Sequence, residues 1–250
     1  GSIALSSDQG TVLVGAVHGQ SVTLTAAHDL TIQDGSVVGA TVGINAGHNL
    51  ILTGGSIEVT AGDLKLDVVE LTTAGETSLS ASGNVHIHDG INRSTINISS
   101  GSLDMIAGND LTLNATADGG GSLQATAGDK LRLGGNIGEM VALDSITLTA
   151  PRLILGGVYR SVDTIQATND IALNETNLDA LVDGLPSVYG FGDSLDIKSA
   201  LGDITIGNYQ GLAYLGDLSL TAGGQVTVGD VTALGDLTIE ASSILLHRRE

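Results

Sequence analysis

The stretch LSLTAGGQVTV at residues 218–228 consists of two short runs in which apolar and polar residues alternate. A corner of small residues, Ala222-Gly223-Gly224, joins the two runs. Alternation with a period of two predicts β-strands that bury one face. Leu, Val and Thr favour strands, and each run is too short and too close to glycine to form a helix. The phrase recurs about every 20 residues along the chain, so the sequence predicts a repeat protein.

Copies of this phrase are recognised by the first apolar residue of the second run, which serves as a landmark. Apolar residues lie eight, six and four positions before the landmark and two positions after it. Five copies follow these offsets without a gap, at Leu30, Leu50, Leu111, Leu131 and Val226. Shorter, partial or looser copies lie at Val12, Leu64, Val85, Leu153, Ile171, Ile204 and Ile244. The copies from Val12 to Ile244 have a mean spacing of about 21 residues.

A single copy cannot bury its own apolar face, but stacked copies can, because each apolar residue then lies above its equivalent in the previous copy. The sequence therefore predicts an all-β fold, a right-handed parallel β-helix (solenoid) of about 12 coils, with the hand given by the crossover rule. We expect residues 1–250 to form a single β-helix segment with Leu24 and Leu30 inside. At about 4.8 Å per coil the rod would be roughly 58 Å long.

One interval departs from the repeat: Ile171 and Ile204 are 33 residues apart. The surplus lies at residues 174–193, which we predict to be a loop insertion extruded from the rod. Insertions in repeat proteins often map to a functional face. Other repeat folds lack their signatures here, because the chain has no leucine-rich consensus, no nine-residue glycine–aspartate repeat and no Trp-Asp motif.

Composition excludes several classes of protein. The 28 acidic and 9 basic residues give a net charge of −19, so we expect no binding to nucleic acid or to an anionic membrane. The absence of cysteine excludes disulfides and thiolate zinc sites. No run of 18 apolar residues occurs, so we expect no membrane insertion. The opening Gly1-Ser2 resembles an expression remnant, so we expect the chain to be a segment of a longer protein.

The corners of the phrase contain Asn and Asp residues just before the landmarks. These residues are Asp29, Asn49, Asp63, Asn84, Asp110, Asp170 and Asp203. We expect their side chains to bond nearby backbone amides as an Asn/Asp ladder, with stacked calcium ligands as the alternative. The basic residues set among them, Lys65, Lys130, Arg132 and Arg152, are expected to reduce the repulsion between the acids.

Two pairs of histidines are placed to approach each other. His28 and His48 occupy the same position in adjacent copies, and His86 and His88 lie on the same side of one expected strand. Imidazole is a common metal ligand, but each pair supplies only two donors. We therefore interpret the histidines as exposed surface residues and predict neither a metal site nor a cofactor.

Four phrases resemble the shaft repeats of filamentous-haemagglutinin-type exoproteins. They are SVTLTAAHDLTI at 21–32, SIEVTAGDLKL at 56–66, SLDMIAGNDLTL at 102–113 and DLSLTAGGQVTV at 217–228. The resemblance covers nearly the whole chain and is specific for a β-helical shaft. It implies two-partner secretion through an outer-membrane transporter and a location outside the cell or on its surface. The Asn-Pro-Asn-Leu and Asn-Pro-Asn-Gly motifs of that family's secretion domain do not occur here, which implies a segment beyond that domain.

The resemblance implies a non-catalytic shaft or adhesin region of a large bacterial exoprotein, active in virulence or biofilm formation. Its partner would be a glycan or protein receptor on a host cell or in a biofilm. The stalk of a contact-dependent toxin and a β-helical polysaccharide-degrading enzyme are the alternatives. The enzyme would need a base beside clustered acids, or paired carboxylates with aromatic platforms. The basic cluster of Lys130, Arg132, Arg152 and Arg160 has only Asp129 at a matching phase, so we predict no catalytic residue.

All five aromatic residues lie in the second half of the chain, at Tyr159, Tyr189, Phe191, Tyr209 and Tyr214. Tyr189 and Phe191 fall in the expected insertion, and Tyr209 and Tyr214 on the adjacent coil. Exposed aromatic rings are platforms for sugars and protein partners, so we predict that any ligand binds at these residues. The alternative is that they pack where the insertion leaves the rod.

Overall fold

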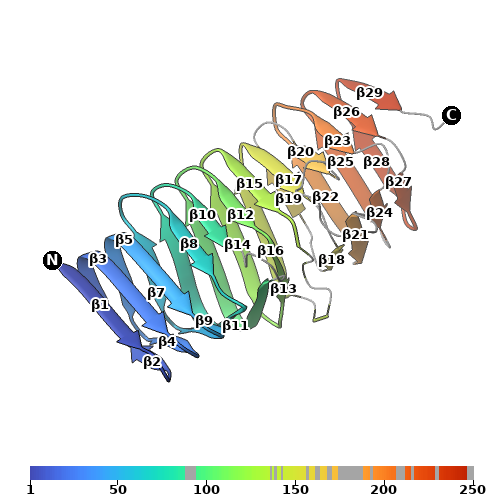
Figure 1. Cartoon of the computed structure of the whole chain (residues 1–250). Helices are drawn as coiled ribbons and strands as arrows, with labels where there is room; N and C mark the ends of the chain where they lie inside the picture. The colour runs from blue at the N-terminus through green and yellow to red at the C-terminus, as the bar shows by residue number, and fades with distance from the viewer. Residues whose placement is uncertain are drawn as a thin grey trace.

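The computed structural model describes residues 1–87, 94–135, 137, 140–141, 143–155, 158–160, 164–167, 171–173, 188–191, 194–206, 212–214, 217–228 and 231–246. Within these residues the fold is all-β, and every pairing between strands is parallel. Successive coils stack into an elongated solenoid with the two chain termini at opposite ends (Figure 1). The predicted parallel β-helix is therefore confirmed. No helix in the described part of the chain is long and apolar enough to cross a membrane.

Each coil has three sides, and the first side is a column of twelve successively paired strands. They are β1 (Ser2–Ser7), β3 (Val17–Ala26), β5 (Ser36–Ala46), β8 (Leu64–Asp67), β10 (Val85–Ile87), β12 (Leu111–Leu113), β15 (Lys130–Leu133), β17 (Arg152–Leu155), β20 (Ile171–Leu173), β23 (Ile204–Ile206), β26 (Gln225–Val228) and β29 (Ser243–Leu246). Complete coils are slightly fewer than the twelve expected. Beyond β29 the described chain has no second or third side, and the coil that starts with β15 has only an isolated bridge at Ile137 on its second side.

The second side begins with β2 (Val12–Val14), β4 (Leu30–Gln33), β6 (Asn49–Thr53), β9 (Glu70–Ala81), β11 (Ser94–Ala107) and β13 (Ala115–Asp118). A separate sheet of β18 (Val158–Arg160), β21 (Val188–Phe191), β24 (Leu212–Tyr214) and β27 (Val231–Ala233) takes the same place in the order of later coils.

The third side contains β7 (Ser56–Val59), β14 (Ser122–Ala127), β16 (Ser145–Ala150), β19 (Thr164–Ala167), β22 (Ser194–Ser199), β25 (Asp217–Ala222) and β28 (Leu237–Glu240). Parts of the long strands complete this side, because β3 and β5 run from the third side of one coil to the first side of the next. The strands β9 and β11 run from the second side to the third side of one coil.

The core consists of aliphatic columns, as the low aromatic content predicts. Leu24 and Leu30 are both fully buried, which confirms the expectation for them. On the first side Leu64, Val85 and Leu111 lie on one another in successive coils, each with no exposed surface. Burial of a leucine-sized side chain stabilises a protein by about 1.5–3 kcal/mol, so the repetition of these columns holds the rod together.

The predicted alignment of the repeat copies within the chain is wrong at one place. Leu50 pairs with Leu71 on the second side, not with Leu64, and Leu64 pairs with Val85 on the first side. The phrase at 56–66 has therefore moved by one side: its first run lies on the third side and its second run on the first. The interval of 14 residues from Leu50 to Leu64 is too short for a whole coil of about 21 residues.

Most of the predicted loop insertion at 174–193 lies outside the described residues. Its residues Val188–Phe191 form strand β21, which pairs with β18 and β24. The chain thus returns to the solenoid before the end of the predicted insertion, and the looped-out character of residues 174–187 stays a prediction.

Candidate functional site

Four of the seven corner Asn and Asp residues accept the hydrogen bonds of the predicted ladder, and Asp170 lies outside the described residues. Asp63 Oδ1 accepts the backbone N–H of Asn84 at 2.7 Å, and Asn84 Oδ1 accepts that of Asp110 at 3.1 Å. Asp29 Oδ1 accepts from Asn49 N–H at 3.2 Å in an earlier coil, and Asp203 Oδ1 accepts from the Gln225 amide at 2.7 Å in a later one. These side chains each satisfy a backbone donor of the next coil, which is the structural role that their residue types favour.

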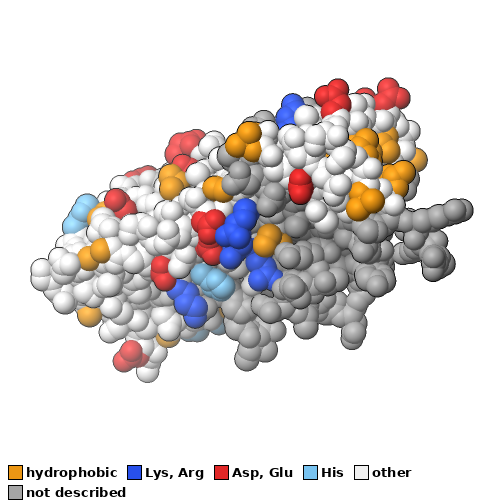
Figure 2. Space-filling model, turned by 90° about the horizontal axis from the view of Figure 1, so that it is seen from above, with side chains coloured by type: hydrophobic (Ala, Val, Ile, Leu, Met, Phe, Trp, Pro, Cys, Tyr) orange, Lys and Arg blue, Asp and Glu red, His pale blue; other side chains and the backbone are white. Residues whose placement is uncertain are grey.

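The basic residues of the middle coils pair with corner acids. Lys130 Nζ lies 2.9 Å from Asp110 Oδ2, and Arg152 Nη2 lies 2.7 Å from Asp129 Oδ2. In both pairs the acid lies one coil before its basic partner. Basic and acidic side chains lie side by side on this part of the rod (Figure 2). Exposed ion pairs contribute about 0–1 kcal/mol each, so their main effect here is to lower the repulsion between stacked acids.

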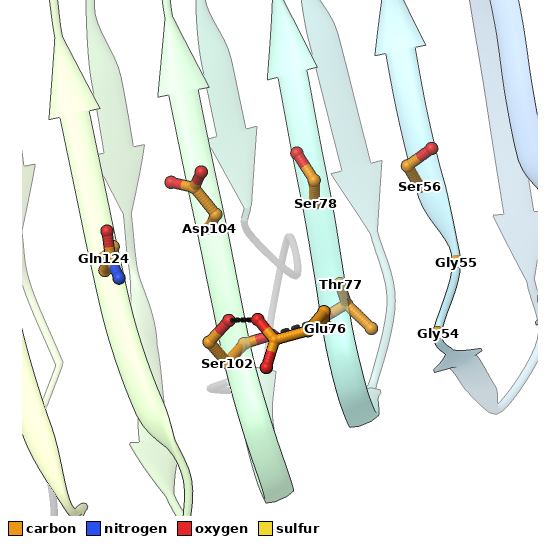
Figure 3. A pocket seen from close by; sticks show the side chains of 9 residues that line it. All are labelled: Gly54, Gly55, Ser56, Glu76, Thr77, Ser78, Ser102, Asp104 and Gln124. Carbon is orange, nitrogen blue, oxygen red and sulfur yellow. Dashed lines mark hydrogen bonds between the residues drawn. The ribbon is translucent and has the colours of Figure 1, made fainter.

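A polar groove lies where the second side turns into the third, and it spans four coils. It has a volume of about 320 Å³ and is lined by Gly54, Gly55, Ser56, Glu76, Thr77, Ser78, Ser102, Asp104 and Gln124. Figure 3 shows the side chains of Ser56, Ser78, Asp104 and Gln124 in one row across neighbouring strands. This row follows directly from the register of β7, β9, β11 and β14.

The groove contains two carboxylates and no basic residue in its lining. Ser102 Oγ donates a hydrogen bond of 2.5 Å to Glu76 Oε2, and Thr77 Oγ1 donates to the carbonyl oxygen of Ser102 at 2.9 Å (Figure 3). Burial raises the pKa of the Asp104 carboxyl above its ordinary value. Chemically the groove can accept hydrogen bonds from hydroxyl or amino groups of a ligand.

Sequence reasoning did not find this groove. The phrase alignment hid the row, because it placed the run at 56–59 on the wrong side of the coil. One signal was present in the sequence: Gly54, Gly75 and Gly101 each stand just before a polar segment in successive coils. All three have positive φ angles, of 59°, 73° and 74°. Such glycines mark tight bends, and the polar side chains that follow them form the groove.

The structure describes only the backbone of four residues of the predicted aromatic site, Tyr159, Tyr189, Phe191 and Tyr214. The backbone of Tyr159 pairs with Gly190, and Gly190 pairs with Tyr214. Tyr189 and Phe191 flank Gly190 on β21. Four of the five residues therefore lie on three neighbouring strands, while Tyr209 lies outside the described residues. The hypothesis of an aromatic binding surface stays a prediction.

The two histidine pairs are placed differently. The exposed rings of His28 and His48 lie with their centroids 5.4 Å apart and their planes tilted by 51°. His86 lies in β10, and His88 is outside the described residues. No group of three or more His, Cys, Asp or Glu side chains in the described part of the chain could hold a metal ion.

Comparison with known proteins returns no relative from which a function could be carried over. The chain matches no protein-family model, no curated protein and no solved structure.

Proposed function

We propose that this chain is a non-catalytic structural shaft or adhesin region of a large secreted or surface-exposed bacterial exoprotein. The observation that carries this proposal is the unbroken column of twelve paired strands, β1 to β29, along the first side. A rod whose coils contact only their neighbours extends without a change of cross-section, which suits a spacer between a cell surface and a binding tip.

The polar residues of the rod support a structural role. The corner acids bond to backbone amides of the next coil, and Lys130 and Arg152 lie in ion pairs with Asp110 and Asp129. These groups stabilise the junctions between coils. The resemblance of the phrases to filamentous-haemagglutinin-type shafts leads to the same role, with two-partner secretion as the proposed export route. A toxin stalk would use the rod in the same way.

A second candidate function is polysaccharide degradation, and the groove at Glu76 and Asp104 favours it. Paired carboxylates can act as acid and base on a glycosidic bond. The hydrogen bond from Ser102 to Glu76 keeps that side chain within the groove. None of the described residues that line the groove is aromatic, so its described lining contains no sugar platform of the usual kind.

Two measurements test the proposal. The chain is incubated with a panel of acidic and neutral polysaccharides, and product chains are sized; we expect no cleavage above the buffer control. Cleavage that disappears in both Glu76→Gln and Asp104→Asn would overturn the shaft proposal in favour of the enzyme. In parallel, distances between labels at positions 2 and 243 are measured by pulsed electron resonance. A narrow distribution near 50 Å, from about 11 coil steps of 4.8 Å, supports a rigid spacer.

A further inference from the structure

The corner that joins the first and second sides brings two histidines into direct register. His28 follows β3 and His48 follows β5, and Ala26 pairs with Ala46 just before them. The N–H of His48 donates to the carbonyl oxygen of His28 at 3.0 Å. Because Leu30 pairs with Leu50 just after the corner, the backbone of both histidines is fixed from both sides.

We propose that His28 and His48 form a binding site for a divalent transition-metal ion of the zinc and copper class. Tetrahedral zinc holds imidazole nitrogens at about 2.0–2.1 Å, and a ring centroid lies roughly 1.1 Å beyond its nitrogen. Two rings bound to one ion at an angle of about 110° therefore have centroids roughly 5.2 Å apart. The observed separation of 5.4 Å is within a few tenths of an ångström of that value.

The surroundings of the pair favour a cation. Both rings are exposed, so a metal ion reaches them without displacing the core, and its remaining positions stay open to water. Asp29 lies next to His28 and places a carboxylate at the same corner, where its Oδ1 accepts the Asn49 amide. The net charge of −19 raises the local concentration of cations around the rod.

The next coil supplies a way to complete the site. Asn49 pairs with Glu70, so Val69 occupies in its coil the position that His48 occupies in the coil before. Val69 is 52% exposed, and its replacement does not open the core. Val69→His should add a third imidazole to the same row. Three protein nitrogens with one open position are the ligand set of many zinc sites.

The experiment is a Zn²⁺ titration by calorimetry on the whole chain, with Cu²⁺ electron paramagnetic resonance as a second readout. We expect one bound Zn²⁺ per chain, and a Cu²⁺ spectrum with hyperfine coupling to two nitrogens. His28→Ala and His48→Ala should each weaken Zn²⁺ binding by about tenfold or more, and Val69→His should strengthen it by about tenfold or more. His18→Ala is the matched control, because this exposed histidine lies near Ser36 rather than another imidazole.

Circular dichroism and thermal melting of every variant establish that the solenoid is intact. Zn²⁺ binding that is equal in the parent chain and in the double variant H28A/H48A would overturn the proposal, since the ion would then bind elsewhere. Equal affinities of Val69→His and the parent chain would also overturn it, because the row of three positions would not converge on one ion.

Discussion

The first three coils and the later coils use the same phrase in different ways. In the first region the two runs of the phrase form the first and second sides, as at 21–32 and 41–52. From residue 56 onwards the two runs form the third side of one coil and the first side of the next, as at 102–113. The phrase therefore specifies strand, corner and strand, but it does not specify which corner of the coil it makes.

Because the phrase forms a different corner in the two regions, the remaining corners of the coil also differ. In the first region β3 and β5 pass without a break from the third side to the first. In the next coils β9 and β11 pass without a break from the second side to the third, through the left-handed glycines Gly75 and Gly101. The coils that contain these long strands thus combine one phrase corner with one bend inside a strand, and the two corners have exchanged places. The length of the coil, rather than the phrase, sets the register.

The largest expected effect comes from two alanines that the phrase makes equivalent. Ala46 is 4% exposed, whereas Ala61 lies on the surface at the corner, because Val59 and not Ala61 pairs with the buried Ala81 of the next coil. Ala46→Asp places an unpaired carboxylate in the core and should lower the free energy of unfolding by about 3 kcal/mol or more. Ala61→Asp should change it by less than about 0.5 kcal/mol. Urea denaturation measures both, and equal losses would contradict the placement of Ala61 at an exposed corner.

The second prediction concerns the leucine that takes the place of Leu64 in the second-side column. Leu71 is fully buried between Leu50 and Ile96, so Leu71→Ala should cost about 2–4 kcal/mol through the cavity it leaves. Leu13 is 66% exposed on the same side, and Leu13→Ala is the matched control with little expected effect. If Leu71→Ala left the free energy of unfolding unchanged in denaturant titration, Leu71 would not be part of the core column.

A third prediction tests the close stacking of corners in the later region. A Cβ added at Gly128 would lie 2.0 Å from the carbonyl oxygen of Gly108 in the previous coil, so Gly128→Ala should destabilise the rod by about 1–3 kcal/mol. At Gly43, an exposed strand residue, the nearest atom to such a Cβ is 3.9 Å away. Gly43→Ala should therefore be neutral. The melting temperatures of both variants decide this, and an unchanged value for Gly128→Ala would show that the corners are not so closely stacked.

A smaller effect is expected when the corner ladder is cut in either region. Asp63→Ala removes the acceptor of the 2.7 Å bond from the Asn84 amide, and Asp29→Ala removes the 3.2 Å bond from Asn49. We expect a loss of about 0.5–1.5 kcal/mol for Asp63 and less for Asp29, because its bond is longer. Amide hydrogen exchange at Asn84 and Asn49 measures the local loss directly. Unchanged protection at Asn84 in Asp63→Ala would contradict the ladder.

The smallest effect concerns pH and the groove. Burial raises the folded-state pKa of Asp104, so the folded chain holds the proton to higher pH than the unfolded chain does. Stability from this group is therefore lost as pH rises from the ordinary carboxyl value, about 3.9, through the raised folded value. Asp104→Asn should be more stable than the parent chain at pH 7, and this advantage should vanish below about pH 4. If Asp104→Asn were more stable than the parent chain by the same amount at pH 7 and below pH 4, the raised pKa of Asp104 would not contribute to stability.

These comparisons also show what the sequence could predict. Period-two alternation and a repeat of about 21 residues sufficed for the parallel β-helix, and the corner residues sufficed for the Asn/Asp ladder. The change of sides at Leu64 could not be predicted from the sequence, because the local pattern of a run is the same on all three sides. The groove at Glu76 and Asp104 escaped for the same reason: it depends on which residues lie across coils, and that register is a property of coil length.

The most direct test of the central claim uses the absence of cysteine from the chain. In the structure Ile51 pairs with Thr72, whereas a phrase that kept its side would place Ile51 beside Lys65. Neighbouring strands about 4.8 Å apart permit a disulfide between paired positions. We predict that the double variant Ile51→Cys, Thr72→Cys forms an intramolecular disulfide under mild oxidation, and that Ile51→Cys, Lys65→Cys does not. Cross-linking of the second variant and not of the first would contradict the account.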